Sequence, residues 1–139
     1  MANPRAIREA MATRLSSITG LTVHDSWPNG LPHPPCAIID TVDAEPGQTF
    51  GRGDLTRWGL DVWLLVSLAP GNQQAIDNLD PYLATSSTGG IYGAIIADPT
   101  LGSVVDYTFV QSYRDMSPFE VDENVAYQGA IVSLECWSR

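Results

Sequence analysis

The sequence contains no lysine and only two histidines, and no apolar run approaches the length of a membrane-spanning helix. A Walker-type phosphate loop requires a lysine, so this nucleotide site is excluded. His24 and His33 lack the spacing of a paired metal ligand, and the nucleophile motif of serine hydrolases is missing. We therefore expect no enzymatic activity, no cofactor and no metal site.

Positive charge is also scarce. Seven arginines stand against sixteen acidic residues, which gives a formal net charge of −9. Such a chain repels phosphate, so tight wrapping of nucleic acid is not expected. Residues 1–20 carry Arg5, Arg8 and Arg14 between their apolar positions and show no secretion-signal pattern. The sequence predicts a protein made in a cytoplasm, with no membrane partner.

The length and apolar content predict one domain over residues 1–139. With 44% hydrophobic residues, the chain can build a core without disulfides or metals. Its two cysteines, Cys36 and Cys136, are a hundred positions apart. We expect both to be small buried side chains, with a disulfide or a shared metal as the minor alternative.

The first segment has the pattern of an amphipathic helix. Asn3 is a suitable N-cap, Pro4 suits the first helical position, and Gly20 supplies the stop. The apolar stripe consists of Ile7, Met11, Leu15 and Ile18. We expect this helix to lie on a sheet.

Three strands are expected next, over residues 21–27, 36–42 and 57–68. The third has an apolar face and a second face made partly apolar by Trp63 and Leu65, which predicts a central position in the sheet. Its main apolar face consists of Trp58, Leu60, Val62, Leu64, Val66 and Leu68. The glycine-containing stretch 43–56 is interpreted as a long loop or a projecting hairpin.

The second half of the chain predicts two helices followed by two strands. Asn72 is a plausible cap for the first helix, which Pro81 should kink or break, and Ser87 or Thr88 can cap a helix ending near Pro99. Strands are expected over residues 103–113 and 126–137, separated by an acidic loop at 114–124. The order α-β-β-β-α-α-β-β predicts an α/β (α+β) domain with a mixed, largely antiparallel sheet of about five strands.

Two parts of the chain are candidate interfaces. The stretch 43–56 and the adjoining Arg57 combine an aromatic anchor with two arginines, which suits contact with a partner. Four tryptophans also exceed what a small domain readily buries, so some are expected in an interface. The candidate contact residues are Phe50, Arg52, Asp54, Arg57, Asp122 and Glu123.

Several short features together resemble the tail terminator (tail-completion) proteins of long-tailed bacteriophages, in particular phages of actinobacteria. They are the N-terminal helix, the proline pair Pro34-Pro35 before a strand, the long strand from Arg57, the helix from Gln73, and the segment Ile91 to Ala97. The similarity covers nearly the whole chain. Pro81 within a helix and the acidic stretch 115–124 depart from the family's pattern.

The resemblance implies a structural virion protein of the tail and neck, assembled in the bacterial host cytoplasm. Members form a ring, usually of six subunits, that stops growth of the tail tube and presents a surface to the head connector. The implied partners are further copies of the chain, the major tail tube protein and the connector. Six copies at −9 each give −54, which suits a channel that passes DNA without binding it.

Two alternatives remain open. A head-closure or minor tail protein shares the size, acidity and architecture of a terminator. A small-ligand-binding α/β module, with a pocket around Tyr92, Tyr107 and Trp63, belongs to a different class.

Overall fold

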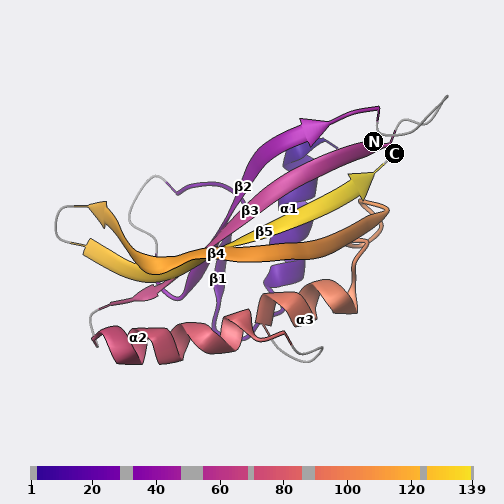
Figure 1. Cartoon of the computed structure of the whole chain (residues 1–139). Helices are drawn as coiled ribbons and strands as arrows, with labels where there is room; N and C mark the ends of the chain where they lie inside the picture. Colours follow the sequence, from indigo (N-terminus) through magenta and orange to yellow (C-terminus); the bar gives the residue numbers. More distant parts are fainter. Residues whose placement is uncertain are drawn as a thin grey trace.

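The chain folds as a five-stranded sheet with helices packed on one face (Figure 1). The computed structural model describes residues 3–28, 33–47, 55–68, 71–85, 90–122 and 125–138, with the side chains at 72, 115–116, 119–122 and 125–126 outside the description. The order α-β-β-β-α-α-β-β is confirmed, with a short 3₁₀ helix added after the second α-helix.

The spatial order of the strands is β1-β2-β3-β5-β4. The first pair, β1 and β2, is parallel, and the other three pairs are antiparallel, so the prediction of a mixed, largely antiparallel sheet is confirmed. The strands span β1 Thr22–His24, β2 Cys36–Glu45, β3 Thr56–Ser67, β4 Tyr107–Asp122 and β5 Val125–Ser138.

Helix α1, Pro4–Leu15, begins as its sequence predicts. Asn3 Oδ1 accepts a hydrogen bond from the Ala6 backbone N–H at 2.8 Å, and Pro4 opens the helix. Ile7, Met11 and Leu15 are all buried against the sheet. The helix ends before Ile18, which packs against the core from the following turn.

Strand β3 lies in the middle of the sheet, as its two apolar faces predict. One face contributes to the main core beneath the helices, through Leu60, Val62, Leu64 and Val66. Leu65 and Trp63 point to the other face, where a smaller apolar cluster forms with Cys36, Ile38 and Tyr127. This strand therefore has the main core on one side and a smaller apolar cluster on the other.

The helical region contains α2 (Asn72–Leu79), the 3₁₀ helix η1 (Asp80–Leu83) and α3 (Gly90–Ala97). The α-helix changes to a 3₁₀ helix at Asp80-Pro81, where the prediction placed a kink or break. Asn72 is wrong as the predicted cap, because Gly71 occupies the cap position and Asn72 is already helical. Ser87 and Thr88 lie outside the described residues.

The acidic loop predicted at 114–124 is wrong. Strand β4 continues to Asp122 and pairs with β5 from Tyr107↔Trp137 to Asp122↔Val125. Its pairing shifts register at three places, and each added residue breaks the alternation that identifies a strand in sequence. The first predicted strand is also too long, because β1 comprises only Thr22–His24.

The excursion predicted at 43–56 is shorter than expected. Antiparallel pairing between β2 and β3 continues to Glu45↔Arg57, so both ends of that stretch are strand. Its central residues 48–54 lie outside the described residues.

Both cysteines are buried and free, which confirms the expectation of small core side chains. Cys136 belongs to the main core under the helices, whereas Cys36 belongs to the apolar cluster on the other face. Along β3, Cys36 is opposite Leu65 and Cys136 is opposite Trp58. The two thiols are therefore on different faces of the sheet and at different positions along its strands, which excludes a disulfide between them.

Neither cysteine should react with a thiol reagent in the native protein at pH 8. Burial raises the pKa of each thiol to about 11, so the reactive thiolate is scarce as well as covered. A colorimetric thiol assay should detect both groups only after denaturation. Rapid reaction of either group under native conditions would contradict the burial described here.

Candidate functional site

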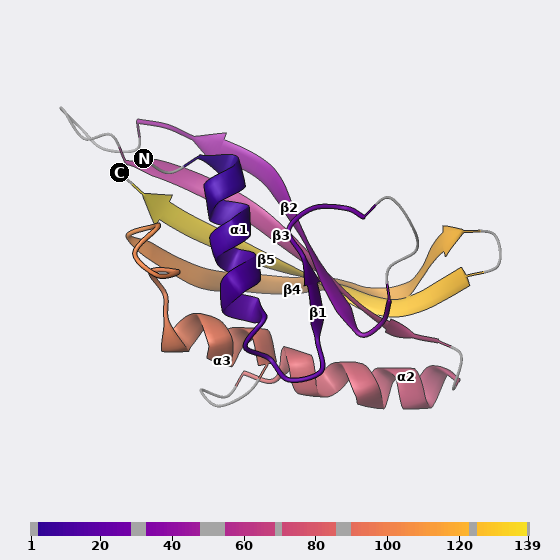
Figure 2. The ribbon, with the colours of Figure 1, turned by 180° about the vertical axis from the view of Figure 1, so that it is seen from behind.

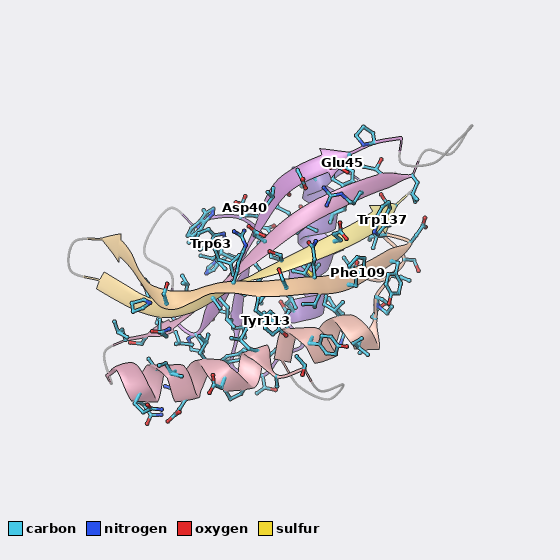
Figure 3. The ribbon with its side chains drawn as sticks, in the orientation of Figure 1. Asp40, Glu45, Trp63, Phe109, Tyr113 and Trp137 are labelled. Carbon is cyan, nitrogen blue, oxygen red and sulfur yellow. The ribbon has the colours of Figure 1, made fainter. Side chains whose placement is uncertain are left out.

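The sheet face opposite the helices is the main candidate site, and we call it the open face. Helix α1 lies behind the sheet in Figure 1 and in front of it in Figure 2, so Figures 1 and 3 look onto the open face. Alternate residues of β3 reach it, beginning with Arg57, Gly59, Asp61 and Trp63, while their neighbours enter the core. Figure 3 shows Glu45, Trp137 and Phe109 toward one end of the sheet, with Asp40 and Trp63 nearer its middle.

At one end of the open face, Arg57 is surrounded by three carboxylates. Its guanidinium donates to Asp43 Oδ2 at 2.8 Å, to Glu45 Oε2 at 3.1 Å and to Glu135 Oε1 at 2.9 Å. The arginine side chain is only 16% exposed, whereas those of Asp43 and Glu45 are about half exposed. One cation thereby joins strands β2, β3 and β5. We call Arg57 and its three carboxylate partners the Arg57 cluster.

In the Arg57 cluster, the charged form of the arginine and the charged form of Glu45 stabilise each other. The hydrogen bond from Arg57 lowers the pKa of Glu45, and the hydrogen bond to Glu45 is the largest cause of a raised pKa for Arg57. Gly59 makes room for the cluster, because a Cβ at this position would lie 2.0 Å from Asp43 Oδ1. The glycine on the polar face therefore allows the carboxylate of Asp43 to lie over the strand and reach Arg57.

Replacing Arg57 with alanine should destabilise the protein by roughly 1 kcal/mol at pH 7, because three carboxylates then lose their common cation. A carboxyl with a lowered folded pKa contributes stability above its unfolded pKa and loses that contribution as pH falls through the folded value. The difference between wild type and Arg57→Ala should therefore shrink below the ordinary glutamate pKa of about 4.3. Urea unfolding at pH 7 and pH 3 measures this, and a difference independent of pH would contradict it.

A second charged group lies at the middle of the open face. Asp61, only 8% exposed, accepts from the guanidinium of Arg114 and from Ser133 Oγ at 3.1 Å. Arg114 Nε also donates to Ser133 Oγ at 3.2 Å. Asp40 lies directly across from Asp61 on the neighbouring strand, so two carboxylates share this position with a single arginine. Like charges at opposed positions destabilise a sheet, so the cation of Arg114 offsets the charge of Asp61 beside Asp40.

The open face carries charged groups at one end and in its middle, and an aromatic pair beside the central group. The ring of Trp27 packs edge-on against that of Trp63, with 5.3 Å between ring centroids. Among the strand side chains that the structure describes, five carboxylates and two arginines lie on this surface, a net of −3. The carboxylates are those of Asp40, Asp43, Glu45, Asp61 and Glu135, and the arginines are Arg57 and Arg114.

Only part of the predicted contact set can be placed. Arg57 is the centre of the cluster above, with three intramolecular partners that sequence reasoning did not identify. Phe50, Arg52, Asp54 and Glu123 lie outside the described residues. Asp122 ends β4, and its side chain is not described. The structure therefore does not test the contact role of this set.

Histidines and other possible metal ligands are dispersed in the part of the chain that the structure describes. Among them, no group of three or more histidine, cysteine or acidic side chains could hold a metal ion. His24 lies on β1 and His33 is exposed before β2. Within the same residues no helix is long and apolar enough to cross a membrane.

A shallow apolar groove lies between α3 and β4. Its lining includes Tyr92 and Tyr107, as the ligand-binding alternative predicted, together with Ile95, Ile96 and Phe109. The third predicted residue, Trp63, instead contacts Trp27 on the open face. The groove measures about 170 Å³. Ligand pockets usually span about 300 to 1,000 Å³, so this groove is small for a drug-sized ligand.

The described residues thus present an acidic open face and an apolar groove at one edge of the sheet. No protein-family model matches the sequence, and no curated protein is significantly similar to it.

Proposed function

We propose that this protein is a structural subunit of a bacteriophage tail, forming a ring that ends the tail tube and joins it to the head connector. The observation that carries the proposal is the one-sided construction of the sheet. Helices cover one face, while the open face presents ordered arginine–carboxylate groups and aromatic side chains. Such a surface suits contact with protein partners more than chemistry on a small molecule.

We infer assembly into a ring from the resemblance of short sequence features to tail terminators. The net negative charge of the chain is compatible with such a ring. A closed ring needs two different contact surfaces on each subunit, joined by rotation. A ring of six copies at −9 each would carry −54, so a channel through it would not retain DNA phosphates. The acidic open face is a candidate for the surface that meets a neighbouring subunit, the tube or the channel.

The proposal is tested by negative-stain electron microscopy and multi-angle light scattering. The purified protein is examined alone and after mixing with the tail tube protein of the same phage. The expected result is rings of about six subunits, or tubes capped at one end, with uncapped tubes when the tube protein is alone. A protein that stays monomeric and leaves tube length and tube ends unchanged would refute the proposal.

The predicted contact residues are tested in the same assay. A variant with alanine at Phe50, Arg52, Asp54 and Arg57 should lose capping if these residues contact a partner, and Arg57→Ala alone is the matched control for damage to the cluster. A second variant, Asp122→Lys with Glu123→Lys, tests the acidic hairpin end. Normal rings, capping and DNA passage in these variants would remove these residues from the interface.

A further inference from the structure

The described part of the sheet has two edges that pair with no further strand of the sheet. Strand β4 pairs with β5 on one side and forms the outer edge of the sheet on the other. At the opposite edge, β1 covers β2 only from Cys36 to Ile38, so residues 39–45 of β2 also lie at an edge. Both edges are visible at opposite sides of the sheet in Figures 1 and 2. Exposed edges of this kind accept strands from other chains.

Strand direction makes these two edges compatible. Strands β2, β3, β5 and β4 alternate in direction across the sheet, because each neighbouring pair is antiparallel. If a second copy is placed beside the first in the same orientation, its β2 therefore runs antiparallel to β4. The joined sheets continue the antiparallel pattern without reversing either subunit.

The side chains on the two edges are also complementary. The β2 edge carries Asp43 and Glu45 and, between Thr41 and Asp43, an extra residue, Val42, whose apolar side chain is 57% exposed. The β4 edge from Tyr107 to Arg114 contains no acidic residue. Beside it lies the apolar groove between α3 and β4, where Ile96 is 46% and Tyr107 is 50% exposed. An edge with one arginine, no carboxylate and an apolar groove beside it fits an acidic edge with one exposed valine.

We propose that residues 39–45 of one subunit add as a strand to residues 107–114 of β4 in a second copy of this chain, with Val42 seated in the α3–β4 groove. This inference rests on the proposed function, because the contact joins different surfaces of identical chains, as the contacts of a closed ring must. A pairing of β2 with β2 would oppose two acidic edges. A pairing of β4 with β4 would produce a dimer with both β2 edges uncovered.

Engineered cysteines distinguish these pairings. Val42→Cys and Ser112→Cys place exposed thiols on the two edges, while the native thiols stay buried. The full-length variants are treated with a short bifunctional maleimide and resolved by denaturing electrophoresis. The expected result is a covalent dimer when the two variants are mixed and no dimer from either alone. The protein carrying both substitutions should give a ladder of products that ends at the ring size.

The outcomes separate this inference from the function on which it rests. Dimers from Ser112→Cys alone would overturn it in favour of a two-fold β4 contact. Rings in electron micrographs without the mixed cross-link would overturn the edge pairing and leave the proposed function standing. A monomer without rings or cross-links, alone and with the tube protein, would overturn both.

A charge at the β2 edge gives an independent test that does not depend on cross-linking. Val42→Lys places an ammonium where the valine side chain would enter the groove, and charged edge positions discourage strand addition. The expected result is loss of the ring in light scattering with an unchanged monomer fold by circular dichroism. Ile76→Lys on α2, where the isoleucine is 41% exposed, is the matched control and should assemble normally. Normal assembly of Val42→Lys would overturn the inference.

Discussion

Replacing Gly90 with alanine should lower the free energy of unfolding by roughly 3 kcal/mol, the largest effect we expect from a single methyl group in this protein. Gly90 opens α3 with φ at +69°, and a Cβ there would lie 2.6 Å from the carbonyl oxygen of Tyr82 and 2.9 Å from that of Pro81. These are backbone atoms of η1, which cannot rotate away as a side chain can. The added methyl group therefore forces the α3–η1 contact apart.

The control for this substitution is Gly102→Ala. Gly102 has the same φ of +69°, but a Cβ there meets nothing within 4 Å. Its replacement should cost only the left-handed backbone strain, about 1 to 2 kcal/mol. Urea unfolding followed by tryptophan fluorescence gives both values, and the difference between them isolates the clash. Equal losses in the two variants would show that α3 and η1 do not pack as described.

Replacing Arg114 with methionine should destabilise the protein by about 2 kcal/mol, below the cost of breaking a fully buried ion pair because Arg114 is half exposed. The substitution removes the cation from Asp61, which is largely buried and directly opposite Asp40. Two carboxylates then face each other across β2 and β3 without an arginine. The thermal and urea unfolding of the variant measure the loss.

A double variant tests whether charge is the cause of that loss. Asp61→Asn in the Arg114→Met background removes one of the opposed charges and should recover at least half of the lost stability. Arg5→Met is the matched control, since Arg5 forms an ion pair with Glu9 on the exposed surface of α1 and should cost nothing measurable. If the Asp61→Asn change further weakens the Arg114→Met protein, repulsion between Asp40 and Asp61 is not the cause.

Local patterns in the sequence predicted the elements that bury one regular face. Helix α1 has its cap, its proline and its apolar stripe within a few residues, so each signal agrees with the others. Strand β3 alternates without interruption from Thr56 to Ser67, and its two apolar faces correctly predicted its central position. Where short-range signals agree in this way, tertiary packing has little to override.

The same reasoning failed where strands carry extra residues. Between Val110 and Asp122, β4 shifts its register against β5 three times. Each shift reverses the phase of the inward and outward positions, so the segment shows no two-residue period and resembles an acidic loop. Its strand character comes from pairing with β5, which no local pattern records.

The candidate site depended even more on distant parts of the chain. Arg57 was predicted as a contact residue at the start of a strand, beside a glycine-containing stretch, but its ion pair with Glu135 joins residues 78 positions apart. The pairing of Asp61 with Arg114 spans 53 positions. One available signal was the glycine at position 59, placed on the polar face of an otherwise bulky strand, which marks room for a side chain from a neighbouring strand.

The extra residue in β2 has a consequence for how the length of this segment can vary. Thr41 is opposite Leu60 and Asp43 is opposite Gly59, so Val42 occupies no rung of the ladder. Deleting Val42 would leave a regular strand with Asp43 and Glu45 still directed toward Arg57, and deleting Thr41 would do the same with Val42 in its place. Deleting Ala44 would instead turn a carboxylate toward the helices. Position 42 is therefore a place where β2 tolerates a deletion without rearranging its charges, and the bulge can be read as a one-residue insertion that the fold has absorbed.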